Sequence, residues 1–405
     1  MDIDIAYLDS KNWIDEEMHE RFRWLRQHDP IHWSEKDDVW VISRFEDVAR
    51  ISKDQKLFTS GQGVRPGLDV KLGLIDEEEP RHGQLRSLIN RGFSPSMVKK
   101  LEEVFTKITD DAIDSVAKKG HCDFVDAISV PLPLRLIAAM IGIREADYDK
   151  FHAWSDAMIA AEGNMDNPEI MTKAGAAYAE YVAYVTPIIE DRRKSPQEDL
   201  VSILVGAKDA GLLETYNQES APGVNADLQN DELLKLMVIL MVAGNETTRN
   251  GISGGMQLLI EHPEARQRLI DDPSLIPAAC EEMLRVNSPV RSFGRTVTRD
   301  VEIGDKSLKA GQRVLIVYTS ANRDEAQFDA PEEFRIDRGA QHLAFGLGNH
   351  FCLGANLARM EMRVAFREVL RRMPDIEYAA GGPVMLPSAL VRTCAEMQVK
   401  FTPEA

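Results

Sequence analysis

Apolar residues recur at intervals of three and four positions along most of this chain, a spacing that places them on one face of an α-helix. The clearest stretches predict helices at 15–27, 95–118, 174–193, 231–261, 276–286 and 355–372. Strand signals are few and short, and the best lie at 39–43 and 314–317, with Trp33 on the partner of the first. The pattern therefore predicts a mainly α chain with small β-sheets, of the α+β class.

Two stretches between these elements have the composition of loops. Residues 214–230 turn polar and contain an Ala-Pro-Gly tripeptide between two long predicted helices. Residues 60–67 carry three glycines and a proline, a composition found in loops that cover ligands and equally in ordinary surface connections. Both interpretations of 60–67 stay open at this point.

Composition and charge narrow the class of protein. The chain has 405 residues and a formal charge of -18, from 48 Lys and Arg against 66 Asp and Glu. This argues against nonspecific nucleic-acid binding, which needs a cationic surface. The longest apolar run, 236–244, is too short to span a bilayer, and the acidic N-terminus lacks the pattern of a signal peptide. We therefore expect a cytoplasmic protein with no membrane anchor and no nucleic-acid partner.

The four cysteines, Cys122, Cys280, Cys352 and Cys394, are far apart in the sequence. They show neither a Cys-x-x-Cys pair nor the clustered spacing of zinc ligands, which argues against a disulfide scaffold or a structural zinc. We expect three of them to be small buried apolar residues. Cys352 differs because it lies in the glycine-rich segment 345–354, directly before a predicted helix.

The position of Cys352 suits a thiolate ligand. A helix that begins at about Leu353 would point free N–H groups and its positive end at the sulfur, which lowers the pKa of a thiol. Gly346, Gly348 and Gly354 would let the backbone approach a flat cofactor and turn amides toward the sulfur. An iron held by a thiolate favours cleavage of the O–O bond. The alternative is a glycine-rich turn with a buried structural cysteine.

The segment 243–248, Ala-Gly-Asn-Glu-Thr-Thr, places polar side chains in the middle of a long apolar helix. Burying Glu246, Thr247 and Thr248 there is costly without partners. Threonine in a helix can bond the carbonyl four residues earlier and bend the helix, and Gly244 leaves space, so the segment predicts a groove for oxygen and ordered water. The alternative is a kinked core helix with a capped polar pair.

Both segments resemble those of one family. Residues 345–354 resemble the haem-binding signature of the cytochrome P450 family, soluble bacterial type, and 243–248 match its pattern of Ala or Gly, Gly, any residue, Asp or Glu, Thr, Thr. The resemblance implies heme b, iron protoporphyrin IX, with Cys352 as the axial ligand of the iron. It also implies that Glu246 and Thr247 are the catalytic acid and alcohol that deliver protons during oxygen reduction.

The resemblance extends over nearly the whole chain, 33–403, and implies the triangular, mainly helical fold of that family. The two or three domains that length alone predicts are then replaced by a single domain, 1–405. Its β-containing part would lie at roughly 30–75 and 290–320.

The family's further site residues carry over position by position. Glu282 and Arg285 match a structural ion pair that would lock the stretch 328–338. Gln84 stands where an arginine is frequent, which puts the hydrogen bonds near His82 in doubt. The residues expected to contact haem, its propionates included, are His82, Arg86, Ala243, Gly244, Arg295, His342, Phe345, Gly346, His350, Cys352 and Gly354. Those expected to contact substrate are Val64, Leu74, Val290, Phe293 and Leu390.

The function that the resemblance implies is a haem-dependent monooxygenase that inserts one atom of O2 into a lipophilic substrate, such as a steroid or a terpenoid. A dinucleotide fingerprint and a flavin domain are absent from the sequence, so electrons from NAD(P)H would arrive through a ferredoxin and a ferredoxin reductase. Arg86, Arg359 and Arg363 would form a basic patch for that ferredoxin, or an ordinary solvated face. The alternatives are a peroxide-driven haem-thiolate hydroxylase of fatty acids and a noncatalytic haem-binding sensor, and Glu246 with Thr247 favours the oxygen-dependent enzyme.

Overall fold

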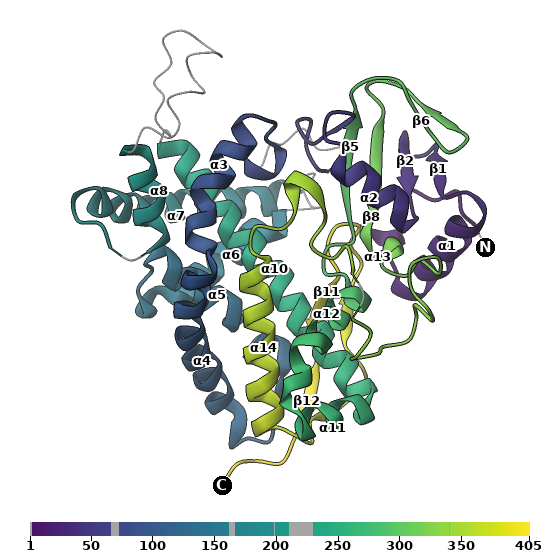
Figure 1. The fold of residues 1–405 in the computed structure, drawn as a ribbon. Coiled ribbons are helices and arrows are strands. Elements are labelled where there is room, and N and C mark those ends of the chain that lie inside the picture. Colours follow the sequence, from purple (N-terminus) through teal and green to yellow (C-terminus); the bar gives the residue numbers. More distant parts are fainter. Residues whose placement is uncertain (1, 66–72, 162–166, 198, 210–229, 340) are drawn as a thin grey trace.

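The computed structural model describes residues 2–65, 73–161, 167–197, 199–209, 230–339 and 341–405. Helices dominate, which confirms the predicted fold class, and the ribbon has a roughly triangular outline (Figure 1). The helices are α1 Asp15–His28, α2 Phe45–Lys53, α3 Arg81–Asn90, α4 Pro95–Ala117, α5 Pro131–Ile141, α6 Tyr148–Ala161, α7 Pro168–Lys194, α8 Leu200–Asp209, α10 Asn230–Glu261, α11 Pro263–Asp271, α12 Ile276–Asn287, α13 Tyr318–Ala321 and α14 Ala355–Arg372.

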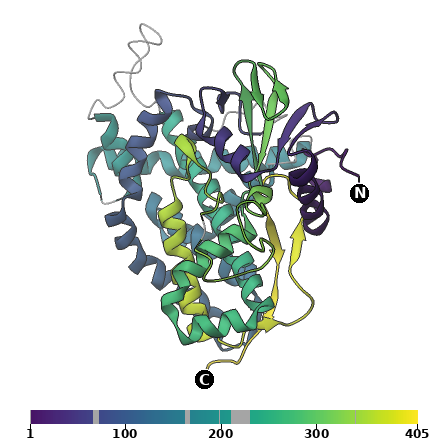
Figure 2. The same ribbon diagram turned by 45° about the vertical axis from the view of Figure 1, so that its right-hand side comes forward.

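The strands are short. They are β1 Ile31–Ser34, β2 Val39–Ile42, β3 Phe58–Thr59, β4 His121–Asp123, β5 Ser292–Val297, β6 Val301–Ile303, β7 Lys306–Leu308, β8 Arg313–Val317, β9 Glu377–Tyr378, β10 Val384–Leu386, β11 Thr393–Glu396 and β12 Gln398–Lys400. Figure 2 shows the C-terminal strands, in yellow, beside the helical part.

All six predicted helices are present, and α14 has the predicted bounds. α7 begins at Pro168, earlier than its apolar pattern indicates, because Asn167 caps it by accepting hydrogen bonds from two backbone N–H groups. The pattern does not predict α5, since that helix is buried on nearly all sides and lacks a polar face to give it a period. The predicted loop at 214–230 lies, except for residue 230, outside the described residues.

One five-stranded sheet, in the order β1-β2-β8-β5-β3, joins the early and late parts of the chain. β1 carries Trp33 and pairs with β2, as predicted, and the two strands run antiparallel with Trp33 opposite Trp40. β2 runs parallel to β8, and β8 antiparallel to β5. Figure 1 shows this sheet, together with α1 and α2, on one side of the helical part. In the part of the chain that the structure describes, we find no helix long and apolar enough to cross a membrane.

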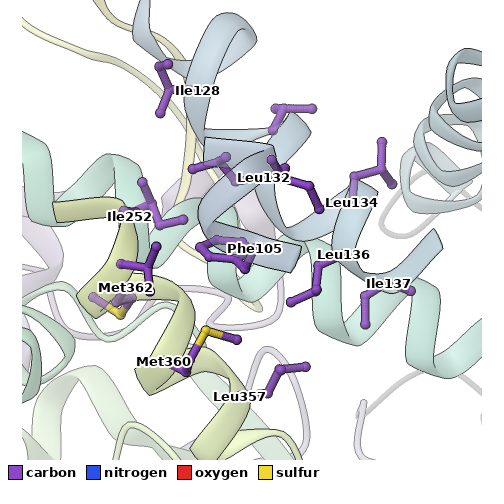
Figure 3. Close-up of a cluster of buried hydrophobic side chains, with 14 of the residues drawn as sticks. Phe105, Ile128, Leu132, Leu134, Leu136, Ile137, Ile252, Leu357, Met360 and Met362 are labelled. Carbon is purple, nitrogen blue, oxygen red and sulfur yellow. The ribbon is translucent and has the colours of Figure 1, made fainter. Parts of the chain in front are cut away.

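α10 packs against α5, α12 and α14 in the middle of the helical part. A Cβ added at Gly254 would overlap Asn287 of α12, and one at Gly255 would overlap Phe366 of α14, so the two glycines allow this close approach. The surrounding apolar side chains form one large core. Figure 3 shows part of it, with Phe105 of α4 near Leu132 of α5 and Met360 of α14.

Glu282 and Arg285 of α12 form a buried, two-bond ion pair, with Nε–Oε2 and Nη2–Oε1 distances of 2.7 and 2.8 Å. The pair also fastens the chain that leads to the cysteine turn. Arg285 donates to the backbone carbonyls of Asn322, Pro331 and Glu333, and Glu282 accepts from the backbone N–H of Arg335 and the side chain of Arg338. The ion pair therefore holds the stretch 328–338, as expected.

Candidate functional site

A cavity lies between the middle of α10 and the turn that precedes α14, with about 1430 Å³ of empty space, some of it open to solvent. Ala243 is exposed although it lies mid-helix, because its side of α10 faces this space. The predicted haem contacts that line the cavity are His82, Arg86, Ala243, Gly244, Arg295, Phe345, Gly346, His350, Cys352 and Gly354. Residues from four distant parts of the sequence thus meet around one space.

The backbone of the cysteine turn is tightly constrained. The N–H of Cys352 donates to the carbonyl of Phe345 at 2.8 Å, which closes the turn. Gly348 has a φ of +74°, and a Cβ there would overlap the carbonyl oxygen of Ser52 at the end of α2. Since both the conformation and the space exclude a side chain, Gly348 fits the turn directly against α2.

The thiol of Cys352 departs from expectation in one respect. Burial raises its pKa, although the backbone N–H of Gly354 and the cations Arg86 and Arg359 act in the opposite direction. The N–H donor predicted at the start of α14 is present, but the loss of water outweighs it. A metal that coordinates the sulfur would remove the proton outright. The other three cysteines are buried, as expected.

Cationic and imidazole side chains gather at one side of the cavity. Arg295 is 4% exposed and donates to the carbonyl of Gly294 at 2.7 Å. Within the described residues no carboxylate forms an ion pair with it, and Asp76 acts on it only from a longer distance. The ring centres of His82 and His350 lie 4.1 Å apart. Burial, followed by the neighbouring His82, Arg295 and Arg86, lowers the pKa of His350 to about 3.

This group of residues fits an anionic ligand. A buried guanidinium without a counter-ion is costly, and Arg86 likewise has no carboxylate partner in the described chain, where it donates to the carbonyl of Phe351. The two carboxylates of a haem would supply the missing negative charge close to the sulfur of Cys352. The side chains present therefore fit the cofactor that the sequence predicts.

His342 does not join this group, contrary to expectation. It lies outside the cavity lining, its Nε2 is 3.2 Å from Oε2 of Glu281, and its Nδ1 accepts the backbone N–H of Ala344 at 3.1 Å. Both ring nitrogens are thus engaged, which leaves none for a propionate. Glu281 also binds Arg359 through two bonds of 2.8 Å. Burial opposes ionisation of Glu281, but the bonds from Arg359 and His342 lower its pKa to about 2.

The two polar residues predicted on α10 point in different directions. Thr247 lines the cavity, and its Oγ1 donates to the carbonyl of Ala243 at 2.8 Å. Glu246 is buried but does not line the cavity. Its carboxylate accepts from Nδ2 of Asn250 at 2.8 Å and lies 2.6 Å from Nη2 of Arg249. The structure therefore places the alcohol at the cavity and the acid behind it.

Gly244 faces a neighbouring helix as well as the cavity. A Cβ there would lie 2.9 Å from Cδ1 of Ile137, so the glycine brings α5 close to α10.

Three of the five predicted substrate contacts, Leu74, Val290 and Phe293, line the cavity. Val64 and Leu390 do not, and each serves through its backbone instead. The carbonyl of Val64 accepts the N–H of Gly294, and that of Leu390 accepts the N–H of Arg291 at 2.7 Å. Their side chains are apolar like those of true lining residues, so the sequence does not distinguish the two roles.

Several lining residues are absent from the sequence-based set. Most are apolar side chains that match the ordinary core pattern of their helices, namely Phe93, Ile137, Ile239, Leu240 and Met362. Glu361 of α14 is different, because it interrupts the apolar face formed by Leu357 and Val364. An acid on the buried face of a helix is a signal that sequence reasoning could have used.

Comparisons with known proteins match this chain to a family model and to curated relatives. Residues 164–374 match the family model described as Cytochrome P450. The steroid C26-monooxygenase of Mycolicibacterium smegmatis is 33% identical over 99% of this chain and 97% of its own length. The methyl-branched lipid omega-hydroxylase of Mycobacterium bovis is 33% identical over 99% of this chain and 95% of its own length.

A solved structure shares the fold of this chain. The crystal structure of CYP109E1 from Bacillus megaterium in complex with testosterone superimposes with a TM-score of 0.83 at 31% identity. The match covers 95% of this chain and 99% of that one.

Proposed function

This chain belongs to the cytochrome P450 family, and we propose that it hydroxylates a steroid or a similar lipophilic molecule. When bound, the haem would supply the activation of O2. Cys352 would hold the iron, Arg86 and Arg295 would neutralise the propionates, and His82 and His350 would help to orient them through hydrogen bonds. Arg86 and Arg295, which form no ion pair with a carboxylate of the described residues, line the same cavity as the thiol of Cys352, and this arrangement supports the assignment most directly.

The apolar part of the cavity lining supports a lipophilic substrate. The lining there comes from the segment around η2 (Leu74–Asp76), from the first half of α10 and from the start of β5. Its members are Leu74, Ile75, Ile239, Leu240, Pro289, Val290 and Phe293. Such a surface excludes water and holds hydrocarbon without fixing it by charge. The relatives named for steroid and methyl-branched lipid substrates fit the same chemistry.

We expect steroids to displace water from the iron of the purified haem protein and to change its spin state, as measured by absorbance, more strongly than terpenoids or fatty acids. Ile239→Ala should weaken this binding by about tenfold, because it removes apolar contact from the lining. Leu390→Ala is the matched control and should leave the affinity unchanged, since Leu390 lies off the lining. A response to fatty acids alone would contradict the proposed substrate class.

Electrons would come from NAD(P)H through a ferredoxin and its reductase, as the sequence predicts. The expected basic patch is smaller than proposed, because Arg359 is bound to Glu281 and lies 4.6 Å from the centre of the Phe345 ring. Arg86 is likewise turned toward the cavity. Of the three arginines of the proposed patch, Arg363 remains the one that we expect to contact the ferredoxin.

Thr247→Ala should uncouple electron use from product formation. Its hydroxyl hydrogen is donated to Ala243, so the oxygen faces the cavity as an acceptor that can position a proton-carrying water. We expect normal haem content, but roughly tenfold less product per NAD(P)H consumed. Thr247→Ser keeps the hydroxyl and should restore most of the yield. Equal yields in wild type and Thr247→Ala would exclude this role.

A further inference from the structure

Four arginines gather beside the N-terminal helix α1, outside the cavity lining. They come from distant parts of the chain: Arg26 lies on α1, Arg291 directly before β5, Arg323 two residues after α13, and Arg392 directly before β11. α1 packs against α13, which brings these segments together (Figure 1). The first three are at most 8% exposed. We call the four residues the α1 arginine cluster.

Two members of the cluster share one carboxylate. Asp15, in the first turn of α1, accepts from Nη2 of Arg291 and from Nε of Arg392, the latter at 2.9 Å. A single negative charge therefore serves two guanidinium groups. This leaves an excess of positive charge beside α1, which is costly away from water.

The remaining carboxylates do not remove that excess. Glu332 is shared between Arg323 and Arg23, at 3.2 and 3.1 Å, and is itself 42% exposed. Glu325 binds Arg26 and lies 3.9 Å from Arg23. In the described chain, the ion pairs of the cluster and of Arg23 thus join five arginines to three carboxylates. The region keeps a net positive charge.

Three buried nitrogen atoms in this region lack a hydrogen-bond partner among the described residues. They are Nε of Arg291, Nη1 of Arg323 and Nδ1 of His19, which lies one helical turn after Asp15 on α1. Buried polar groups in folded proteins are nearly always satisfied, and an apparent exception points to a bound water or ion. The excess of positive charge favours an anion, because a water molecule would neutralise none of it.

The electrostatics place His19 within the same cluster. Burial, and then the charges of Arg323, Arg392, Arg291 and Arg26, lower the pKa of His19 well below its ordinary value. The imidazole is therefore neutral at pH 7, and its Nδ1 can carry a hydrogen. Burial also lowers the pKa of Arg323 to about 10, and nearby arginines act in the same direction.

The pattern of free donors indicates the kind of anion. At Arg291, Nη2 binds Asp15 and Nη1 binds the carbonyl of Trp13 at 3.4 Å, so Nε is the donor left over. At Arg323, Nε binds Glu332 and the buried Nη1 is left over. Carboxylates and phosphates are held best by two parallel N–H groups of one guanidinium. Single donors from separate side chains suit a spherical ion better.

We propose that the α1 arginine cluster and His19 bind a small inorganic anion such as chloride, which accepts the free N–H groups of Arg291, Arg323 and His19. The ion lies apart from the cavity and takes no part in hydroxylation. It links α1 to three segments from the later part of the chain, so that the N-terminal helix depends on it for part of its attachment. The proposal is independent of the proposed substrate.

Thermal unfolding of the haem protein tests this site. When sodium chloride replaces sodium gluconate at constant ionic strength, the melting temperature of wild type should rise by a few degrees and then level off, because the folded state alone binds the ion. Arg323→Met keeps much of the side-chain volume but removes the donor and the charge, and should lose most of this rise. Arg268→Met, which changes an exposed arginine, is the matched control and should keep it. An equal rise in wild type and Arg323→Met would overturn the proposal.

A second experiment needs no substitution, and so it decides the question even if Arg323→Met fails to fold. Bromide has the charge of chloride and scatters X-rays anomalously. Crystals of the wild-type haem protein soaked in sodium bromide should show an anomalous peak within hydrogen-bond distance of Nη1 of Arg323 and Nδ1 of His19. The absence of a peak there, in crystals with bromide bound elsewhere on the surface, would overturn the proposal.

Discussion

Cys352→Ser should abolish the thiolate haem site. Among the described cysteines, Cys352 is the one that lines the cavity, whereas the other three are buried elsewhere. A serine hydroxyl is a far weaker acid than a thiol and a poor ligand for haem iron. We expect the variant to lose the red-shifted absorbance band of the reduced, carbon-monoxide-treated protein and to lose hydroxylation to background.

Cys280→Ala is the matched control for this experiment. Cys280 lies buried on α12, outside the cavity lining, and burial raises its pKa far from the range in which a thiol reacts. The control should keep the band at full intensity. A thiolate band that survives in well-folded Cys352→Ser would show that Cys352 is not the ligand of the haem iron.

Arg285→Leu should produce the largest loss of stability among the substitutions considered. Removing Arg285 leaves the buried carboxylate of Glu282 with fewer donors and frees three backbone carbonyls of the stretch 322–333. Breaking a buried pair in this way costs about 3–5 kcal/mol. We expect a lower midpoint of urea unfolding and a smaller fraction of haem-loaded protein, because this stretch leads to the cysteine turn.

Arg268→Leu supplies the contrast. Arg268 pairs with Asp337 at 3.1 Å, and both side chains are exposed, so its loss should cost less than about 1 kcal/mol. Similar unfolding midpoints for Arg285→Leu and Arg268→Leu would show that the α12 pair does not carry the stability assigned to it.

The parts of the fold that sequence could predict are those with a single buried face. α10 and α14 have such faces, and their predicted bounds agree with the structure within a residue. α5 has apolar residues on nearly every side, so its pattern lacks the period of an amphipathic helix. The short strand β3 draws its stability from β5, a partner far away in the sequence, which local patterns do not reveal.

The site shows the same division between local and distant causes. Cys352, Gly348 and Thr247 belong to compact motifs whose spacing already indicates their chemistry. The placement of His342 depends on Glu281, 61 residues away in the sequence, and the sequence contains no sign of that contact. Glu246 differs, because Arg249 and Asn250, which hold it away from the cavity, follow it by three and four residues on α10, a spacing that the sequence does show.

The parallel pairing of β2 with β8 sets an order on biosynthesis. β2 (Val39–Ile42) cannot pair with β8 (Arg313–Val317) until β8 has been synthesised. On the ribosome the β1–β2 hairpin is therefore made long before the strand that pairs with it. A two-stranded hairpin is marginally stable alone in water, and pairings between such distant segments form slowly. Gly348 rests on α2 beside this sheet. The cysteine turn therefore reaches its support on α2 only after the strand that completes this sheet has been synthesised.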